Sequence, residues 1–261
     1  GLGIDVFAAL TTGDNNTAVG FKALIGNTTG SGNTAFGKGA GYRITTGSDN
    51  TYLGHTDDSN AGAATSSSNT FIGRSAGERN TSGNSNTFIG ALCGDLATTG
   101  NTNTGVGSSA LTALTTAANN TAVGSSAMAA NTTGTANAAF GNLFLDANTT
   151  GSYNTSIGYG TLTSNTTGHD NTAVGINSLA ANTTAHYNTA VGSSALEGCT
   201  TGEYNTAVGQ LSMDAASMTG NFNSALGRAA LGANTTGSSN CAVGINALAG
   251  NTTGGNNCAM G

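Results

Sequence analysis

A five-residue pattern, Asn-Thr-Ala-apolar-Gly, recurs with small variations fifteen times in this chain of 261 residues. Successive copies begin 17 residues apart, except for one interval of 19 and one of 18. A fixed period this short predicts one structural unit stacked on copies of itself, which is a solenoid. Positions in each repeat are numbered from its first Asn, as offset 0; these residues are Asn16, Asn33, Asn50, Asn69, Asn86, Asn103, Asn120, Asn137, Asn154, Asn171, Asn188, Asn205, Asn223, Asn240 and Asn257.

The repeat is too short for two helices and a turn, and its apolar residues do not follow a helical period. Thr, Val, Ile and Phe cluster in its first segment, which favours a strand. We expect a first strand at offsets 0 to 4, a second at offsets 7 to 10, and a turn through the Asn-Thr-Thr-Gly that ends most repeats. The predicted fold is all-β, a parallel β-solenoid (β-roll) of about 15 coils with a 17-residue repeat. It forms a single array over residues 1–261, with a lengthened loop at 55–68.

Four positions of the repeat carry the expected interior. Offset 3 is apolar in every copy, and we interpret it as the most reliable core position. Offset 8 is mostly Leu or Met. The Asn residues at offset 0 are expected to form a hydrogen-bonded ladder from coil to coil. Offset 11 is usually Asn but also Leu10, Ile44, Ala97, Leu114 or Cys199, an exchange that indicates an inward-facing site.

Offset 2 bears on the oligomeric state. It is Ala in most copies, so the strand is apolar on both faces, which is typical of strands buried on both sides. Where offset 2 is Phe71 or Phe88, offset 8 shrinks to Gly77 or Gly94. This exchange predicts that the two positions share a space, either within a coil or between chains. We favour association of parallel chains, most simply a homotrimer.

Charge and hydropathy exclude several classes of partner. The net charge is −6 with six Lys and Arg in total, which does not suit a nucleic-acid-binding protein. No apolar run approaches the length needed to span a membrane, and we find no signal peptide. Apolar residues make up 37% of the chain in a strict period, unlike a disordered tract. Because the chain begins and ends inside a repeat, we expect it to be a segment of a longer fibre.

Catalytic and metal-binding patterns are not evident. The acidic residues are mostly isolated, and no nucleophile, phosphate-loop or zinc-protease motif occurs, so we expect no enzyme activity and no cofactor. Asp57 and Asp58 could bind a cation with His55, but the segment is rich in Ser, Asn and Ala, and we interpret it as a solvated bulge. Cys241 and Cys258 both occupy offset 1 in successive coils, within reach of a disulfide, but we interpret them as small residues in place of Thr.

A lateral patch stands out at offsets 15 and 16, which elsewhere are usually Ser, Asn or Gly. In five successive repeats these positions carry aromatic, His and acidic residues, which aligned coils would place along one edge. Such a row suits binding of a cell-surface glycan by ring stacking and hydroxyl hydrogen bonds. The alternatives are that these exposed positions vary freely, or that the edge packs on a neighbouring chain. The candidate binding residues are Tyr153, His169, Asp170, His186, Tyr187, Glu203, Tyr204 and Phe222.

The repeat, for example Asn-Thr-Ala-Val-Gly at 171–175, resembles the arrays of bacteriophage tail fibres and related surface proteins. It is similar, less closely, to the β-roll head repeats of trimeric autotransporter adhesins. The resemblance implies a trimeric fibre on a virion or outside the cell that carries host or surface binding. Two alternatives stay open. Ranks of Thr at offsets 1, 12 and 13 resemble ice-binding solenoids, and open coil ends could polymerise into an extracellular filament.

Overall fold

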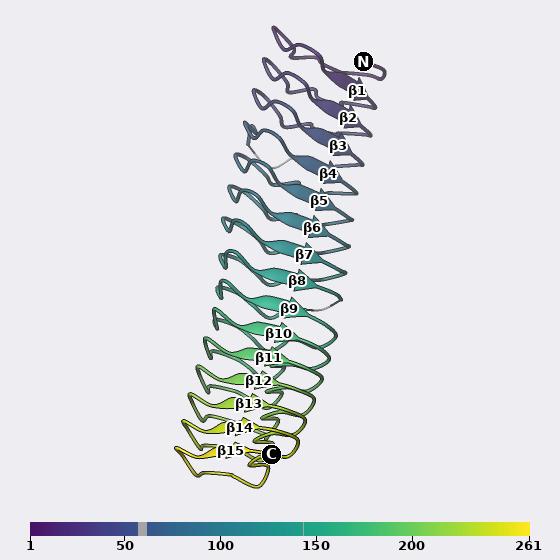
Figure 1. Cartoon of the computed structure of the whole chain (residues 1–261). Helices are drawn as coiled ribbons and strands as arrows, with labels where there is room; N and C mark the ends of the chain where they lie inside the picture. The colour runs from purple at the N-terminus through teal and green to yellow at the C-terminus, as the bar shows by residue number, and fades with distance from the viewer. Residues whose placement is uncertain (57–61, 143) are drawn as a thin grey trace. The chain divides into compact units, whose positions relative to one another are not determined.

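The computed structural model describes residues 1–56, 62–142 and 144–261. Contacts divide the chain into two units, Gly1–Thr133 and Gly134–Gly261, which we describe separately. Both are built the same way: each coil of the repeat contributes one short strand, and the strands pair in chain order (Figure 1). The expected parallel β-solenoid is therefore confirmed. The prediction of one array over 1–261 stays a prediction, and the lengthened loop at 55–68 lies partly outside the described residues.

Among its described residues, the first unit contains seven strands of three residues each. Neighbouring strands are parallel, and residues one repeat apart are partners, as Thr17 and Thr34 are. The strands are β1 (Thr17–Val19), β2 (Thr34–Phe36), β3 (Thr51–Leu53), β4 (Thr70–Ile72), β5 (Thr87–Ile89), β6 (Thr104–Val106) and β7 (Thr121–Val123).

The part of the second unit that the structure describes contains eight strands in the same arrangement. The register is again one repeat, with Ala173 paired to Ala190, and it holds across the 18-residue interval, where Thr206 pairs with Ser224. The strands are β8 (Ala138–Phe140), β9 (Thr155–Ile157), β10 (Thr172–Val174), β11 (Thr189–Val191), β12 (Thr206–Val208), β13 (Ser224–Leu226), β14 (Cys241–Val243) and β15 (Cys258–Met260).

The expected second strand at offsets 7 to 10 was wrong, and the first strand is shorter than expected. The backbone after the strand runs through turns, with left-handed residues at offsets 6 and 8, for example Asn177 (φ 54°) and Leu179 (φ 51°). A left-handed residue reverses the chain direction, so an extended segment cannot form there. The turns still bond from coil to coil, as the Leu179 N–H donates to the Ala195 oxygen at 3.1 Å.

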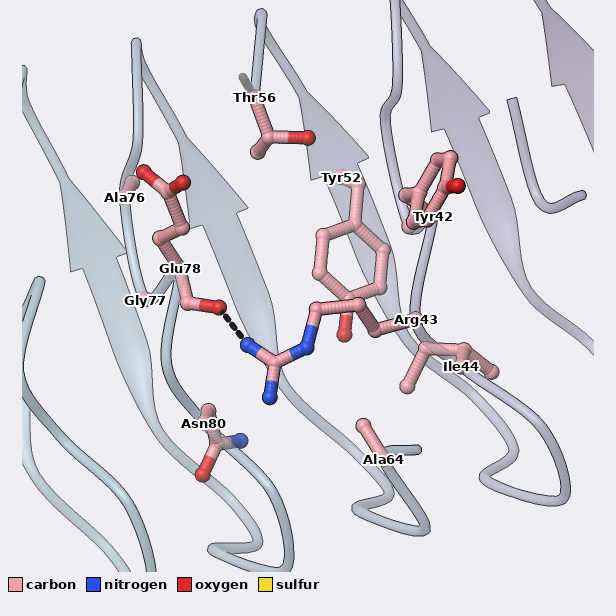
Figure 2. Close-up of a pocket in the computed structure, with 11 residues that line it drawn as sticks. Tyr42, Arg43, Ile44, Tyr52, Thr56, Ala64, Ala76, Gly77, Glu78 and Asn80 are labelled. Atoms are coloured by element: carbon pink, nitrogen blue, oxygen red, sulfur yellow. Dashed lines mark hydrogen bonds between the residues drawn. The ribbon is translucent and has the colours of Figure 1, made fainter. Parts of the chain in front are cut away.

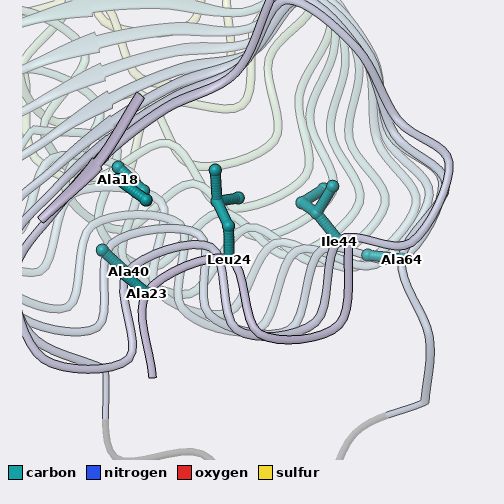
Figure 3. Close-up of a cluster of buried hydrophobic side chains, with 7 residues drawn as sticks. Ala18, Ala23, Leu24, Ala40, Ile44 and Ala64 are labelled. Carbon is teal, nitrogen blue, oxygen red and sulfur yellow. The ribbon is translucent and has the colours of Figure 1, made fainter. Parts of the chain in front are cut away.

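The expectation that offset 3 forms the core was also wrong. Ala173 at offset 2 is fully buried, whereas Leu226 at offset 3 is 52% exposed. Alternate residues of a strand point to opposite faces, and the narrow interior of a 17-residue coil accepts the small side chain. Figure 3 shows this interior in the first unit, where Ala18 (offset 2), Leu24 (offset 8) and Ile44 (offset 11) are buried together. Offset 8 is confirmed as core.

Offsets 2 and 8 share their space within one coil, not between chains. A Cβ on Gly94 would lie 2.5 Å from the Phe88 ring, so Gly is required at offset 8 of this coil. The rings of Phe71 and Phe88 stack inside the first unit with centroids 5.3 Å apart, and Tyr52 meets Phe71 edge-on at 5.4 Å. Each coil therefore buries its own inner face, and offset 2 no longer supports a trimer.

The predicted Asn ladder at offset 0 is confirmed. In the second unit the Asn171 amide donates to the Ala185 oxygen at 2.8 Å, and its oxygen accepts the Asn188 N–H at 3.0 Å. The side chain thus ties the turn of its own coil to the backbone of the next one. Offset 11 faces inward as expected, since Asn182 and Leu114 are both fully buried at this position.

Candidate binding surface

The lateral patch lies in the turn that leads from each coil into the next strand. Its offset-16 residues adopt left-handed conformations, with φ of 60° at Tyr153 and Tyr187 and 57° at Tyr204. Non-glycine residues are uncommon in this conformation. The same conformation recurs at this offset in coil after coil, so side chains of like position project outward in a column.

An aromatic column runs along offset 16. The Tyr187 and Tyr204 rings stack with centroids 4.8 Å apart and planes 15° apart, and Tyr204 and Phe222 stack at 5.0 Å and 11°. These separations match the spacing of about 4.8 Å between neighbouring strands. The three side chains remain 45%, 47% and 59% exposed, so their edges and outer faces are open to a ligand.

A second column runs along offset 15. The His169 and His186 rings stack with centroids 3.7 Å apart, and the His169 ring meets Tyr187 edge-on at 5.2 Å. The backbone N–H of His169 donates to Nδ1 of His186 at 3.0 Å, which fixes the neutral His186 with its proton on Nε2. His169 Nδ1 lies 2.8 Å from Oδ2 of Asp170.

This packing makes the histidine column sensitive to pH. The pKa of His186 lies below its usual range, first because the ring is partly buried and second because His169 is stacked on it; Glu203 and Asp170 oppose the shift. A pKa lower in the folded than in the unfolded chain stabilises the fold at pH above about 6.5, the unperturbed histidine value. That contribution is lost as the pH falls through the folded pKa.

The structure brings the predicted residues together along one edge of the second unit. Asp170 occupies the rung between Tyr153 and Tyr187, so Tyr153 lies in the same column, two rungs beyond the continuous stack. The Glu203 N–H donates to Asn221 Oδ1 at 2.6 Å, which places Glu203 in the offset-15 column. We call this surface the aromatic ladder: Tyr153, His169, Asp170, His186, Tyr187, Glu203, Tyr204 and Phe222.

Two further surfaces escaped the sequence reasoning. Offset 3, expected inside, forms an outward apolar column in both units. We call it the apolar stripe; in the second unit its exposed members are Phe140, Ile157, Val191, Leu226 and Met260. A cleft beside Tyr159 lies among the turns at offsets 5 to 10. An acidic residue at offset 9 in three of five successive repeats was the available signal.

The first unit contains a small pocket of about 20 Å³, room for a water molecule and little more. Arg43 crosses it, donating through Nη1 to the backbone oxygen of Glu78 (Figure 2) and through Nε to the Gly62 oxygen at 3.0 Å. Burial raises the pKa of the Tyr52 hydroxyl at the pocket wall well above its usual range. The burial of Tyr52 and the backbone contacts of Arg43 indicate a packing role for these two side chains.

Other candidate chemistry finds little geometric support. Within residues 1–56, 62–142 and 144–261, His, Cys, Asp and Glu form no group of three suited to a metal ion. Asp57 and Asp58 lie outside the described residues. Cys241 and Cys258 are register partners with free thiols. Burial raises the pKa of the Cys93 thiol to about 12.

The structure shows how the Thr residues at offsets 1 and 12 are arranged. Offset-12 hydroxyls bond within the stack, as Thr166 Oγ1 donates to the Thr183 oxygen at 3.1 Å. Offset 1 points outward beside offset 3, so the strand face shows one Thr rank and one apolar rank. The ice-binding alternative stays a prediction, which thermal hysteresis would test.

Among the described residues, no helix has the length and apolar character to cross a bilayer.

No protein-family model matches this chain, and neither does any curated protein or solved structure.

Proposed function

We propose that this chain is a non-catalytic fibre shaft, exposed on a virion or outside the cell, that attaches to a glycan on a host or other surface through the aromatic ladder. The observation that carries the proposal is the exposed stack of Tyr187, Tyr204 and Phe222. Each coil of a solenoid contacts only its neighbours, so further coils lengthen the molecule without changing its construction, which suits a shaft. The resemblance to tail-fibre and adhesin repeats supports the same assignment.

The aromatic ladder has the chemistry for sugar recognition. Aromatic side chains offer a flat apolar face with little conformational freedom, and the tyrosine hydroxyls add a polar edge. The carboxylates of Asp170 and Glu203 can accept hydrogen bonds from sugar hydroxyls. Because the ring spacing is set by the backbone stack, little ordering is needed on binding, which lowers its cost.

Replacing both Tyr187 and Tyr204 with Ala is expected to weaken glycan binding at least about tenfold, since each ring contributes about 1 kcal/mol or more of contact. A glycan array would identify the ligand for the unmodified chain, and calorimetry would give the dissociation constants. Phe21→Ala removes an exposed ring outside the ladder and serves as the control. Unchanged affinity in the double variant, with the circular dichroism spectrum preserved, would contradict the assignment of the ladder.

We also propose that the apolar stripe is the surface through which copies of the chain associate, with a homotrimer as the expected state. Contiguous exposed apolar surface is uncommon on soluble monomers and marks association sites. The stripe recurs at the same offset in every coil, so a parallel copy of this chain matches its spacing along the whole length of each unit. The low total charge leaves little electrostatic repulsion between copies.

Sedimentation equilibrium tests this association. We expect a trimer mass for the unmodified chain and a monomer mass when Val191 and Leu226 are both replaced by Glu, because six buried carboxylates could not be paired. Ile245→Glu introduces the same charge at an exposed apolar residue outside the stripe and should leave the mass unchanged. A monomer mass for the unmodified chain at micromolar concentration would rule out this role for the stripe.

A further inference from the structure

The second unit holds a cleft of about 440 Å³ that is separate from the aromatic ladder. It is formed by turn residues at offsets 5, 6, 9 and 10 of four successive repeats, and includes Asn142, Asp146, Tyr159, Thr163, Asn177 and Glu197. Its volume falls within the range of small-molecule sites. The ladder residues occupy offsets 15 and 16, so the two surfaces use different turns of the coil.

The negative charge of the cleft favours a positively charged ligand. Asp146 and Glu197 line it, and its lining residues include no Lys or Arg. Asp214 continues the same offset one rung beyond Glu197, close enough that Glu197 helps to raise the pKa of its carboxyl, although burial is the larger cause. Residues 134–261 contain five acidic residues and a single basic one, Arg228. A negative cleft with so little compensation attracts a positively charged ligand.

Asp146 lines the cleft with a partly buried carboxyl group. Burial raises the pKa of this carboxyl, and hydrogen bonds from the backbone of Asp146 and Ala147 oppose the shift. An ammonium group seated against the Asp146 carboxyl would hold it ionised.

Tyr159 narrows the class of ligand. Its side chain is 71% exposed at the cleft, an open aromatic face suited to stacking on a sugar ring or a cation. Asn142, Asn177 and Thr163 add amide and hydroxyl groups that can bond to sugar hydroxyls. Acidic groups at Asp146 and Glu197 are three repeats apart, so an extended polymer could engage both in turn.

We propose that this cleft binds a linear oligosaccharide of 2-amino sugars with free, protonated amines, such as a β-1,4-linked glucosamine chain. The amines pair with Asp146 and Glu197, and one sugar ring stacks on Tyr159. The site is independent of glycan attachment at the aromatic ladder.

Isothermal titration calorimetry with a glucosamine tetramer tests the proposal on the full chain. We expect the affinity for the tetramer to decrease as the salt concentration rises. The affinity is also expected to decrease about tenfold in Glu197→Gln and in Tyr159→Ala, in line with the loss of one charge pair or one ring contact. Glu203→Gln removes a carboxylate from the ladder and should leave this affinity unchanged. The Tyr187 and Tyr204 double variant should also bind normally, so failure of the ladder assignment would not affect the result.

Two other ligands distinguish the role of the amines from the role of the sugar ring. The fully N-acetylated tetramer lacks the positive charge and is expected to bind at least about tenfold more weakly. Spermine carries amines but no sugar ring, so equal affinity for spermine that is insensitive to Tyr159→Ala would overturn the sugar assignment. Absence of binding by the glucosamine tetramer, or equal binding of its acetylated form, would overturn the proposal.

Discussion

Replacing Gly175 with Ala is expected to lower the free energy of unfolding of the Gly134–Gly261 unit by about 4 kcal/mol, combining backbone strain and steric overlap. Gly175 has a φ of 123°, and a Cβ added there would lie 2.6 Å from the backbone oxygen of Gly192 in the next coil. The neighbour is backbone and cannot rotate away. It is also held in the stack, because the Gly192 N–H donates to the Val174 oxygen at 2.8 Å.

Gly250→Ala is the matched control for Gly175→Ala. Gly250 does not have a positive φ, and an added Cβ meets nothing within 4 Å. We expect a change of less than about 1 kcal/mol there, or slight stabilisation through the unfolded state. Thermal and urea denaturation followed by circular dichroism would measure both variants. Equal stability of the two would show that the coils can separate enough to admit a methyl group at offset 4.

Every repeat carries Gly at offset 4, which is a sequence sign of a backbone position where a Cβ is costly. The direction of the strand side chains has no such sign. Offsets 2 and 3 are both apolar, so the pattern allows two registers that differ by one residue, and the larger side chains at offset 3 favour the wrong one. The interior width decided otherwise: Ala173 fits within a coil beside Leu179, and a larger residue such as Phe88 needs Gly94 opposite.

The turns explain why one surface could be predicted and another could not. The aromatic ladder follows from period alone, because any in-register stack aligns Tyr187 with Tyr204. The cleft beside Tyr159 depends on the path of offsets 5 to 10, which we expected to be a strand. Left-handed Leu and Asn residues such as Leu179 and Asn177 set that path. Asn adopts this conformation more readily than most residues, but Leu has no such preference, so the stack imposes it at Leu179.

Replacing Asn171 with Leu is expected to cost about 3 kcal/mol, more than the same change at Asn182. Without the Asn171 amide, the buried Asn188 N–H loses its acceptor, Asn154 Oδ1 loses a donor at 3.2 Å, and the Ala185 oxygen keeps only the longer of its two donors. An unsatisfied buried polar group costs about 1–3 kcal/mol. Because solenoid stability sums terms between neighbouring coils, the loss is concentrated where two coils meet.

Asn182 is the matched comparison for Asn171, since both amides are fully buried and lie in the same coil. Its oxygen has no partner among the described residues, and the Ala185 oxygen that its amide contacts at 3.3 Å keeps the Asn171 donor at 2.8 Å. The Asn182 amide also donates to the buried Asn165 Oδ1 at 2.9 Å, and this bond is lost in the variant. Leu114 already fills the equivalent position in the first unit. We therefore expect Asn182→Leu to lower the free energy of unfolding by about 1–2 kcal/mol, less than Asn171→Leu. Equal losses for the two variants in urea denaturation would contradict the larger contribution assigned to the hydrogen bonds of the offset-0 column.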